Sequence, residues 1–163
     1  MNDTLIRPIQ PADNAAMAAI VRQVLKSFNA AKPGTAYYDA NLDNLYDVFR
    51  VEGSAYWVAE QHGEILGGGG IYPTNGMPAG YCELVKLYLD EGARGKGIGR
   101  QLINSCTQAA IKMSYTYMYL ETMPELTIAV PLYEKLGFAY INEPLGNSGH
   151  TDCNIWMVKE LDV

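Results

Sequence analysis

The sequence has no hydrophobic run approaching the roughly 18 residues that a membrane-spanning helix requires. Residues 1–7 contain no apolar stretch of the kind found in signal peptides. Charged residues make up only 18% of the chain, 48% of the residues are hydrophobic, and no segment is dominated by one residue type. This composition is typical of an ordered globular protein. We therefore expect a cytoplasmic location and no membrane partner.

Cysteine is also scarce. Cys82, Cys106 and Cys153 are far apart, odd in number, and form no Cys-x-x-Cys pair. A disulfide framework or a zinc site needs closer, paired spacing. We expect three reduced thiols, buried or half-buried, and no metal site.

Basic residues are too few for a nucleic-acid-binding protein. The chain has 12 Lys and Arg against 18 Asp and Glu, a formal net charge of −6. Because binding to phosphate backbones needs a basic surface, we expect no nucleic-acid partner. An acidic protein suits a small cationic substrate, although such a charge also serves solubility alone.

Hydrophobic periodicity predicts a chain in which strands and helices alternate. The predicted strands are residues 4–9, 55–60, 64–72, 81–89, 117–122, 138–142 and 154–161. Helices are predicted after Asp13 as an N-cap, at 42–49, at 98–113 and at 129–136. The helix at 98–113 has an apolar stripe made of Ile98, Leu102, Ile103, Cys106, Ala109, Ala110 and Met113. A length of 163 residues and the lack of a linker predict that residues 1–163 form a single domain.

Four consecutive glycines, Gly67 to Gly70, lie inside the strand predicted at 64–72. Glycine weakens a strand and packs nothing. The run therefore indicates either that something large packs over this strand or that the chain bends there.

A second glycine-rich segment, Arg-Gly-Lys-Gly-Ile-Gly at residues 94–99, lies where a strand gives way to a helix. Its glycines let the backbone approach a ligand closely. The first N–H groups of the helix are unpaired and carry the positive end of its dipole. With the nearby basic side chains they form a site for a diphosphate, although a tight basic turn is the simpler alternative. The candidate cofactor-binding residues here are Arg94, Gly95, Lys96, Gly97, Gly99 and Arg100.

Two common glycine motifs do not fit this segment. A P-loop ends in Gly-Lys-Ser/Thr and has four residues between its glycines. A dinucleotide fingerprint is Gly-x-Gly-x-x-Gly inside a βαβ unit. Here Gly99 follows Gly97 one residue too early, and the preceding strands are expected to be antiparallel. The spacing disfavours a Rossmann-like oxidoreductase.

Instead, Arg94-x-x-Gly97-x-Gly99 resembles the Gln/Arg-x-x-Gly-x-Gly/Ala signature of the GNAT superfamily of acetyltransferases. Residues 132–138, Leu-Tyr-Glu-Lys-Leu-Gly-Phe, resemble the element that commonly ends the cofactor-binding half of that family. The order of elements also matches, so the resemblance covers essentially the whole chain. It implies an α/β (α+β) fold, with a mixed, largely antiparallel sheet of about seven strands flanked by about four helices. It also implies an N-acetyltransferase with acetyl-coenzyme A (acetyl-CoA) as cosubstrate and no metal.

Acetyl transfer to an amine requires removal of a proton from the amine, polarisation of the thioester carbonyl, and protonation of the departing thiolate. Glu83 is the candidate base. It lies in an otherwise apolar strand, where its pKa can rise. It precedes Arg94 by eleven positions, the spacing of the catalytic glutamate in the histone-acetylating members that the chain resembles. The alternatives are a structural glutamate that pairs with Lys86 or a loop amide and one that only orders water.

Tyr133 is the candidate acid, because the resemblance directs its hydroxyl at the sulfur of coenzyme A (CoA). A core aromatic at helical spacing is the alternative. The resemblance also assigns the acetyl carbonyl to the backbone N–H of Leu87 and the pantetheine amides to Leu89, as an added strand. In one respect the chain departs from the family, since Leu126 stands where many members carry an asparagine that holds the cofactor arm.

The acceptor side is less well defined by the sequence. Tyr37, Tyr38, Tyr72 and His150 are candidate substrate contacts, because loops at these places frame the acceptor cleft in the family. A lone histidine in a polar loop is more often solvated than catalytic.

These patterns predict transfer of an acetyl group from acetyl-CoA to a primary amine of a small molecule or peptide, by direct attack in a ternary complex. A non-catalytic module of the same fold that binds CoA is the alternative. Polyamines, amino sugars, amino acids and peptide termini all remain open as acceptors. Pairing of two copies through the C-terminal strands is common in the family and would give a homodimer.

Overall fold

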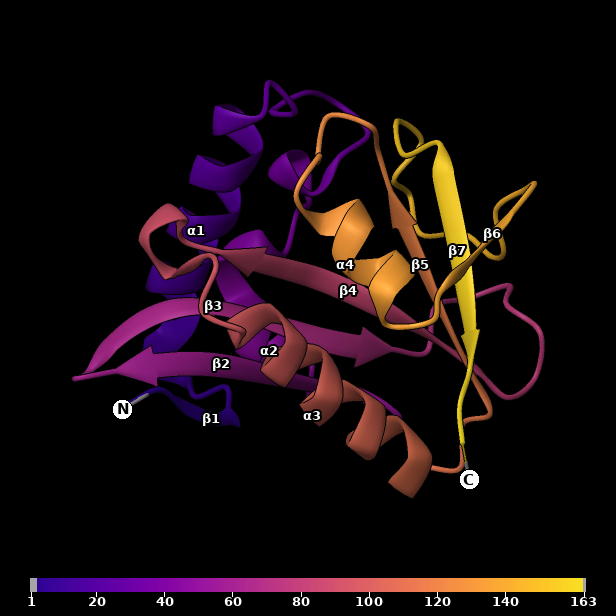
Figure 1. Cartoon of the computed structure of the whole chain (residues 1–163), viewed down its shortest axis with the longest axis horizontal. Coiled ribbons are helices and arrows are strands. Elements are labelled where there is room, and N and C mark those ends of the chain that lie inside the picture. The colour runs from indigo at the N-terminus through magenta and orange to yellow at the C-terminus, as the bar shows by residue number, and fades with distance from the viewer. Residues whose placement is uncertain (1–2, 163) are drawn as a thin grey trace.

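The computed structural model describes residues 3–162 and arranges them in the predicted order of strands and helices (Figure 1). The strands are β1 (Leu5–Pro8), β2 (Ala55–Gln61), β3 (Glu64–Tyr72), β4 (Tyr81–Leu89), β5 (Tyr117–Thr122), β6 (Ala139–Ile141) and β7 (Ile155–Glu160). The helices are α1 (Asn14–Ser27), α2 (Leu45–Val48), α3 (Ile98–Lys112) and α4 (Ala129–Lys135). Short 3-10 turns precede α1, α2 and α3 and lie in the loop at Ala36–Tyr38.

The strands form one seven-stranded sheet in the order β1-β2-β3-β4-β5-β7-β6. The β4–β5 pair is parallel and the other pairs are antiparallel. The predicted fold class, a mixed and largely antiparallel sheet with four helices, is therefore confirmed. Helices α1 and α3 cover opposite faces of the sheet, and α4 lies on the same side as α3, over the gap between β4 and β5 (Figure 1).

The gap between β4 and β5 is the feature that positions the site. The two strands pair only where Tyr81, Cys82 and Glu83 face residues 117–119, and beyond Glu83 they diverge (Figure 1). Strand β3 pairs with one edge of β4 along its length. The opposite backbone edge of β4, beyond Glu83, has no partner strand within residues 3–162 and faces the gap between β4 and β5.

Both explanations suggested for the glycine run in β3 apply: a large side chain packs over the strand, and the chain bends there. A Cβ atom on Gly68 would lie 2.6 Å from the Tyr56 ring, and one on Gly70 would lie 2.5 Å from the same ring. The β3–β4 register also shifts between these two glycines, as in a β-bulge. On β4 the bulge gives Lys86 a φ of 50°, and the Tyr56 hydroxyl donates a hydrogen bond of 2.7 Å to the Lys86 carbonyl. Tyr56 thus stabilises the bend in β4 that lies where this strand diverges from β5.

Helix α3 packs the predicted apolar stripe against the sheet, with Ala109 partly buried and Met113 exposed. Ile98, Leu102, Ile103 and Cys106 are buried, but Met113, placed on the same stripe by its spacing, is 40% exposed. The reason is that α3 ends at Lys112, so Met113 is its C-cap and no longer follows the helical periodicity.

Asp13 holds the N-cap position of α1 as predicted, but its carboxylate makes no capping bond to that helix. It accepts the backbone N–H of Gln10 at 2.8 Å and bonds from the Arg7 guanidinium at 2.8 and 3.0 Å. The buried Asp13 carboxylate therefore ties β1 to the turn that enters α1.

The three cysteines are free thiols, with Cys82 and Cys106 buried and Cys153 half-buried, as expected. Within residues 3–162, no three His, Cys, Asp or Glu side chains gather in a way that could hold a metal ion. None of the helices described is long and apolar enough to cross a membrane.

Candidate active site

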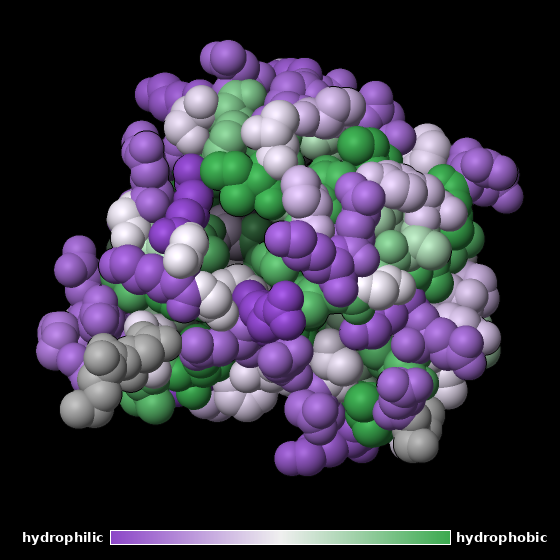
Figure 2. Space-filling view, in the orientation of Figure 1, coloured by the Kyte–Doolittle hydropathy of each residue, from purple (hydrophilic) through white to green (hydrophobic). Residues whose placement is uncertain are grey.

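A pocket fills the gap between β4 and β5, and we call it the splay pocket. It is lined by residues 83–89 of β4, residues 121–123 at the end of β5, Leu132 and Tyr133 of α4, and Val24 and Phe28 near the end of α1. Figure 2 shows its mouth as a hollow with a hydrophobic floor between α1 and α4, with hydrophilic residues around the rim. The pocket thus offers an apolar channel along an open strand edge.

The glycine loop forms one end of this pocket. Gly95 and Gly97 have φ values of 77° and 78°, a left-handed conformation that favours glycine, and Gly97 is the N-cap of α3. Within residues 3–162, no atom beyond the adjacent residues lies within 4 Å of where a Cβ would stand on either glycine, so the space beside the loop is open. The first bond of the helix runs from the Gln101 N–H to the Gly97 carbonyl, which leaves the preceding N–H groups free for an anion. This geometry fits an anion such as a diphosphate.

The basic residues of the loop are divided between the pocket and the surface. Arg94 lines the splay pocket, where its guanidinium lies 5.0 Å from the centre of the Phe28 ring and donates a 3.3 Å hydrogen bond to the Leu89 carbonyl. Lys96 and Arg100 are exposed. Gly99 packs against α4, because a Cβ there would lie 3.1 Å from the Leu132 side chain.

Glu83 is the last residue of β4 that pairs with β5, and it is 2% exposed. The Thr74 hydroxyl donates a 2.6 Å hydrogen bond to its Oε1. Burial raises the pKa of Glu83 to about 7, and the charge of Glu121 adds to this, while Thr74, His150 and Lys86 act in the opposite direction. Near neutral pH this carboxyl group can therefore both accept and release a proton.

A second cavity, which we call the side pocket, lies on the other side of Glu83. Its walls include Tyr72 and Thr74, the α2 region, and Asn147 and Ser148 of the loop before β7. The two cavities share the lining residues Glu83, Val85, Lys86 and His150. The two cavities therefore adjoin at these four residues.

The shared wall is held by an ion cluster around Asp39. The His150 Nε2 lies 2.9 Å from both carboxylate oxygens of Asp39, and the Lys86 Nζ lies 2.6 Å from Oδ2. Burial acts to raise the pKa of Asp39, but the contacts with His150 and Lys86 outweigh it and lower that pKa overall. His150 is therefore tied to a carboxylate rather than solvated.

Two side chains of β5 anchor the loop that carries His150. Glu121 accepts hydrogen bonds from the hydroxyls of Tyr119, at 2.6 Å, and Ser148. The Tyr119 oxygen also accepts the Leu145 N–H at 3.1 Å. The loop is thereby held over the end of the sheet, which places His150 against Asp39.

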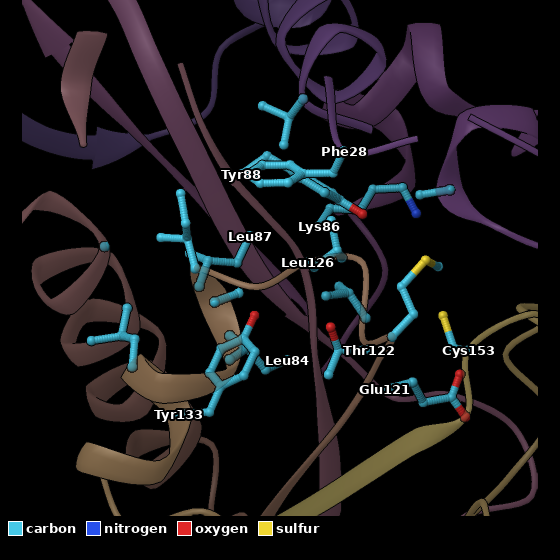
Figure 3. A pocket seen from close by; sticks show the side chains of 18 of the residues that line it. Phe28, Leu84, Lys86, Leu87, Tyr88, Glu121, Thr122, Leu126, Tyr133 and Cys153 are labelled. Carbon is cyan, nitrogen blue, oxygen red and sulfur yellow. The ribbon is translucent and has the colours of Figure 1, made fainter. Parts of the chain in front are cut away.

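Tyr133 projects from α4 into the splay pocket, and its hydroxyl faces the gap between the strands (Figure 3). Its ring packs edge-on against Phe138 with 5.8 Å between the centroids. Burial raises the pKa of the hydroxyl well above its usual value, so it carries its proton at neutral pH. Leu126 lines the same pocket as an apolar side chain (Figure 3).

Of the acceptor-side candidates, only Tyr72 and His150 line the side pocket. Tyr37 packs partly buried against the core beside α1, and Tyr38 is 61% exposed, with the two rings 5.1 Å apart. Both lie outside the lining of the two cavities. Leu87 and Leu89 line the splay pocket, as their expected backbone role requires.

Sequence reasoning missed three polar residues of the site: Thr74, Glu121 and Thr122. Thr74 lies in a turn-rich loop, where no pattern marks its contact with Glu83. Glu121 and Thr122 lie at the end of a strand. Alternation along the strand predicts that they face opposite sides of the sheet, but it does not predict which residues they contact.

Comparison with known proteins agrees with the geometry. A model of the acetyltransferase (GNAT) family matches residues 20–138. The N-acetyltransferase YjgM of Escherichia coli (strain K12) is 42% identical over 158 residues, covering 96% of this chain and 95% of that protein.

Two solved structures show the same fold. A GNAT-family acetyltransferase from Staphylococcus aureus Mu50 superposes with a TM-score of 0.86 at 20% identity, covering 98% of this chain and 99% of that chain. The protein yncA from Salmonella typhimurium, solved with its cofactor acetyl-CoA, gives 0.76 at 22% identity and covers 99% of this chain and 96% of that chain.

Proposed function

Because the chain belongs to the acetyltransferase (GNAT) family, we propose that it transfers an acetyl group from acetyl-CoA to a primary amine of a small molecule or peptide, by direct attack in a ternary complex. The observation that carries this proposal is the position of Glu83. It is buried in the wall shared by two cavities, one suited to the donor and the other open for an acceptor.

The donor would occupy the splay pocket. The backbone of the glycine loop, with Gly95 and Gly97 open to the outside, would hold the diphosphate. The free edge of β4 at Leu87 and Leu89 would pair with the pantetheine arm as an added strand does. When bound, acetyl-CoA supplies the acyl thioester, and the Leu87 N–H would stabilise the charge that develops on its carbonyl oxygen.

The acceptor would enter through the side pocket, in contact with Tyr72 and His150. Glu83 would take the proton from its ammonium group, directly or through one water. A carboxylate whose pKa is raised to about 7 is a stronger base than an ordinary glutamate and is still largely ionised slightly above neutral pH. The freed nitrogen lone pair then forms the N–C bond to the acetyl carbon.

Tyr133 would complete the transfer. As the C–S bond breaks, its hydroxyl donates a proton to the departing sulfur. The attacking nitrogen, which still carries two protons, releases one to solvent to give the amide, and Tyr133 is reprotonated from solvent. Cys153 also lines the splay pocket, but burial raises the pKa of its thiol to about 12, so it is protonated at neutral pH. This supports direct attack by the amine over an acyl-cysteine intermediate.

Initial-rate kinetics with both substrates varied test this proposal. Direct attack in a ternary complex predicts double-reciprocal lines that intersect. Parallel lines, together with an acylated protein detected by mass, would instead indicate a covalent route.

A further inference from the structure

Thr122, the last residue of β5, carries a buried hydroxyl group without a partner. The residue is 3% exposed, and its Oγ1 makes no hydrogen bond to any residue among 3–162. Buried polar groups are nearly always hydrogen-bonded, because one left unpaired destabilises the fold. This hydroxyl therefore requires an explanation.

The hydroxyl is directed into the splay pocket. Figure 3 shows the Thr122 oxygen facing the gap between β4 and β5, on the same side as the Tyr133 hydroxyl. Its neighbour Glu121 turns the other way along the strand, toward Tyr119 and Ser148. The orientation of Thr122 is thus set by the alternation of β5.

The backbone fixes this orientation. Thr122 pairs with Ile155 in the β5–β7 ladder, and its carbonyl accepts the Asn154 N–H at 3.1 Å. A β-branched side chain on such a strand has little rotational freedom. The hydroxyl is consequently held in place rather than free to turn toward another partner.

The hydroxyl of Thr35, in the same pocket, differs from that of Thr122 because it has hydrogen-bond partners within the fold. Thr35 also lines the splay pocket, but its hydroxyl is used within the fold and contacts the carbonyls of Ala30 and Lys32 at 3.1 and 2.7 Å. Leu126, which lines the same pocket, offers only an apolar surface (Figure 3). In this stretch of the wall, Thr122 is therefore a polar group placed to meet a ligand.

We propose that the Thr122 hydroxyl hydrogen-bonds an amide group of the pantetheine arm as that arm passes between β4 and β5. The arm alternates amides with short alkyl segments, which matches a largely apolar channel in which the Thr122 hydroxyl is directed inward and has no partner among the described residues of the fold. Thr122 is thus a positioning residue for the donor, and it supplies a polar contact that Leu126 cannot. This inference rests on the proposed binding of acetyl-CoA in the splay pocket.

Calorimetric titration of Thr122→Val and Thr122→Ser with CoA tests this inference. Valine keeps the shape and removes the hydroxyl, whereas serine keeps the hydroxyl. We expect Thr122→Val to bind CoA about three- to tenfold more weakly than the wild type, and Thr122→Ser to bind it nearly as well. A second probe, adenosine 3′-phosphate 5′-diphosphate, is the nucleotide half of CoA without the arm, and Thr122→Val should bind it with unchanged affinity.

The matched control is Thr107→Val on α3, which removes a hydroxyl that bonds to the Ile103 carbonyl at 2.8 Å outside the pocket lining. It should leave CoA affinity unchanged. In thermal unfolding without ligand, Thr122→Val should be at least as stable as the wild type, because no bond within the fold is lost, whereas Thr107→Val should melt lower.

Equal CoA affinity in Thr122→Val and the wild type would overturn the inference, as would equal weakening for CoA and its nucleotide half. If the wild type binds no CoA, both this inference and the proposed function fail. If it binds CoA without transferring an acetyl group, the proposed function fails, and the binding comparison still decides the role of Thr122.

Discussion

The Thr74 hydroxyl donates a 2.6 Å hydrogen bond to Oε1 of Glu83 at the junction of the two cavities. This bond stabilises the ionised carboxylate against the burial that raises its pKa to about 7. Thr74 therefore adjusts the pH at which Glu83 becomes a base. Its contact also keeps the carboxylate turned toward the side pocket.

The pH dependence of the reaction should follow Glu83. We expect kcat/KM of the wild type to rise with pH through about 7, as Glu83 loses its proton. Glu83→Gln should lose most activity at low pH, where the acceptor is mostly ammonium, and should recover partly as free amine forms at high pH. Thr74→Val removes the bond that lowers the pKa, so its rising limb should move to higher pH. Parallel profiles of Glu83→Gln and the wild type would exclude Glu83 as the base.

The pH dependence of the free energy of unfolding should report the ionisation of Glu83 in the absence of any substrate. The pKa of Glu83 is about 7 in the fold, above its ordinary value of 4.5, so the folded state binds the proton more tightly than the unfolded state. The contribution of the protonated Glu83 to the stability of the fold is complete below about pH 4.5 and is lost as the pH rises through 7. Glu83→Gln cannot ionise, so its stability relative to the wild type should increase by about 2 to 3 kcal/mol between pH 5 and pH 8.

Denaturant unfolding of the two proteins at both pH values measures this change. A difference in stability that does not depend on pH would show that Glu83 titrates as an ordinary glutamate in the fold.

The role of Tyr133 can be separated from its packing. Tyr133→Phe removes one hydroxyl and keeps the ring that packs on Phe138. We expect turnover to fall roughly ten- to a thousandfold, with little change in CoA affinity, as for loss of a general acid. Rates should be compared where chemistry limits turnover, which a pre-steady-state measurement establishes. Equal turnover under those conditions would leave Tyr133 as a core residue.

The glycine loop predicts a charge effect on cofactor binding. CoA should raise the melting temperature of the wild type by binding the native state, and Gly97→Glu should abolish that shift, since it places a carboxylate beside the diphosphate. Gly97→Ala is the matched control. Both variants carry a side chain at φ 78° and should lose about 1 to 2 kcal/mol of stability, but the alanine variant should keep a clear CoA shift. A full shift in Gly97→Glu would refute the site.

The sequence predicted the regular elements well where periodicity was strong. The strands at 64–72, 81–89 and 117–122 have the predicted bounds, because alternation or a continuous apolar run is ended on each side by turn residues. The last two strands are shorter than predicted, at Ala139–Ile141 and Ile155–Glu160, since pairing rather than hydrophobicity sets their ends. Met113 was wrongly placed on the buried stripe for a similar reason, the end of a helix.

The site was predictable only in its local motifs. The glycine loop, Glu83 and Tyr133 were marked by spacing within single segments. The contact between His150 and Asp39 joins residues 111 positions apart, and nothing in either segment specifies the other. The splay of β4 from β5 likewise depends on Tyr56 packing over glycines of the neighbouring strand. Such features arise from tertiary packing, which no single window of sequence contains.

The most direct test of the proposed function is thiol release from acetyl-CoA in the presence of a panel of acceptors. The panel should contain polyamines, amino sugars, amino acids and peptides with free termini, with Tyr133→Phe as the matched variant of reduced turnover. We expect release that depends on one class of amine, with the acetylated amine identified by mass. Tight CoA binding without release for any amine would contradict it and would indicate a CoA-binding module of the same fold.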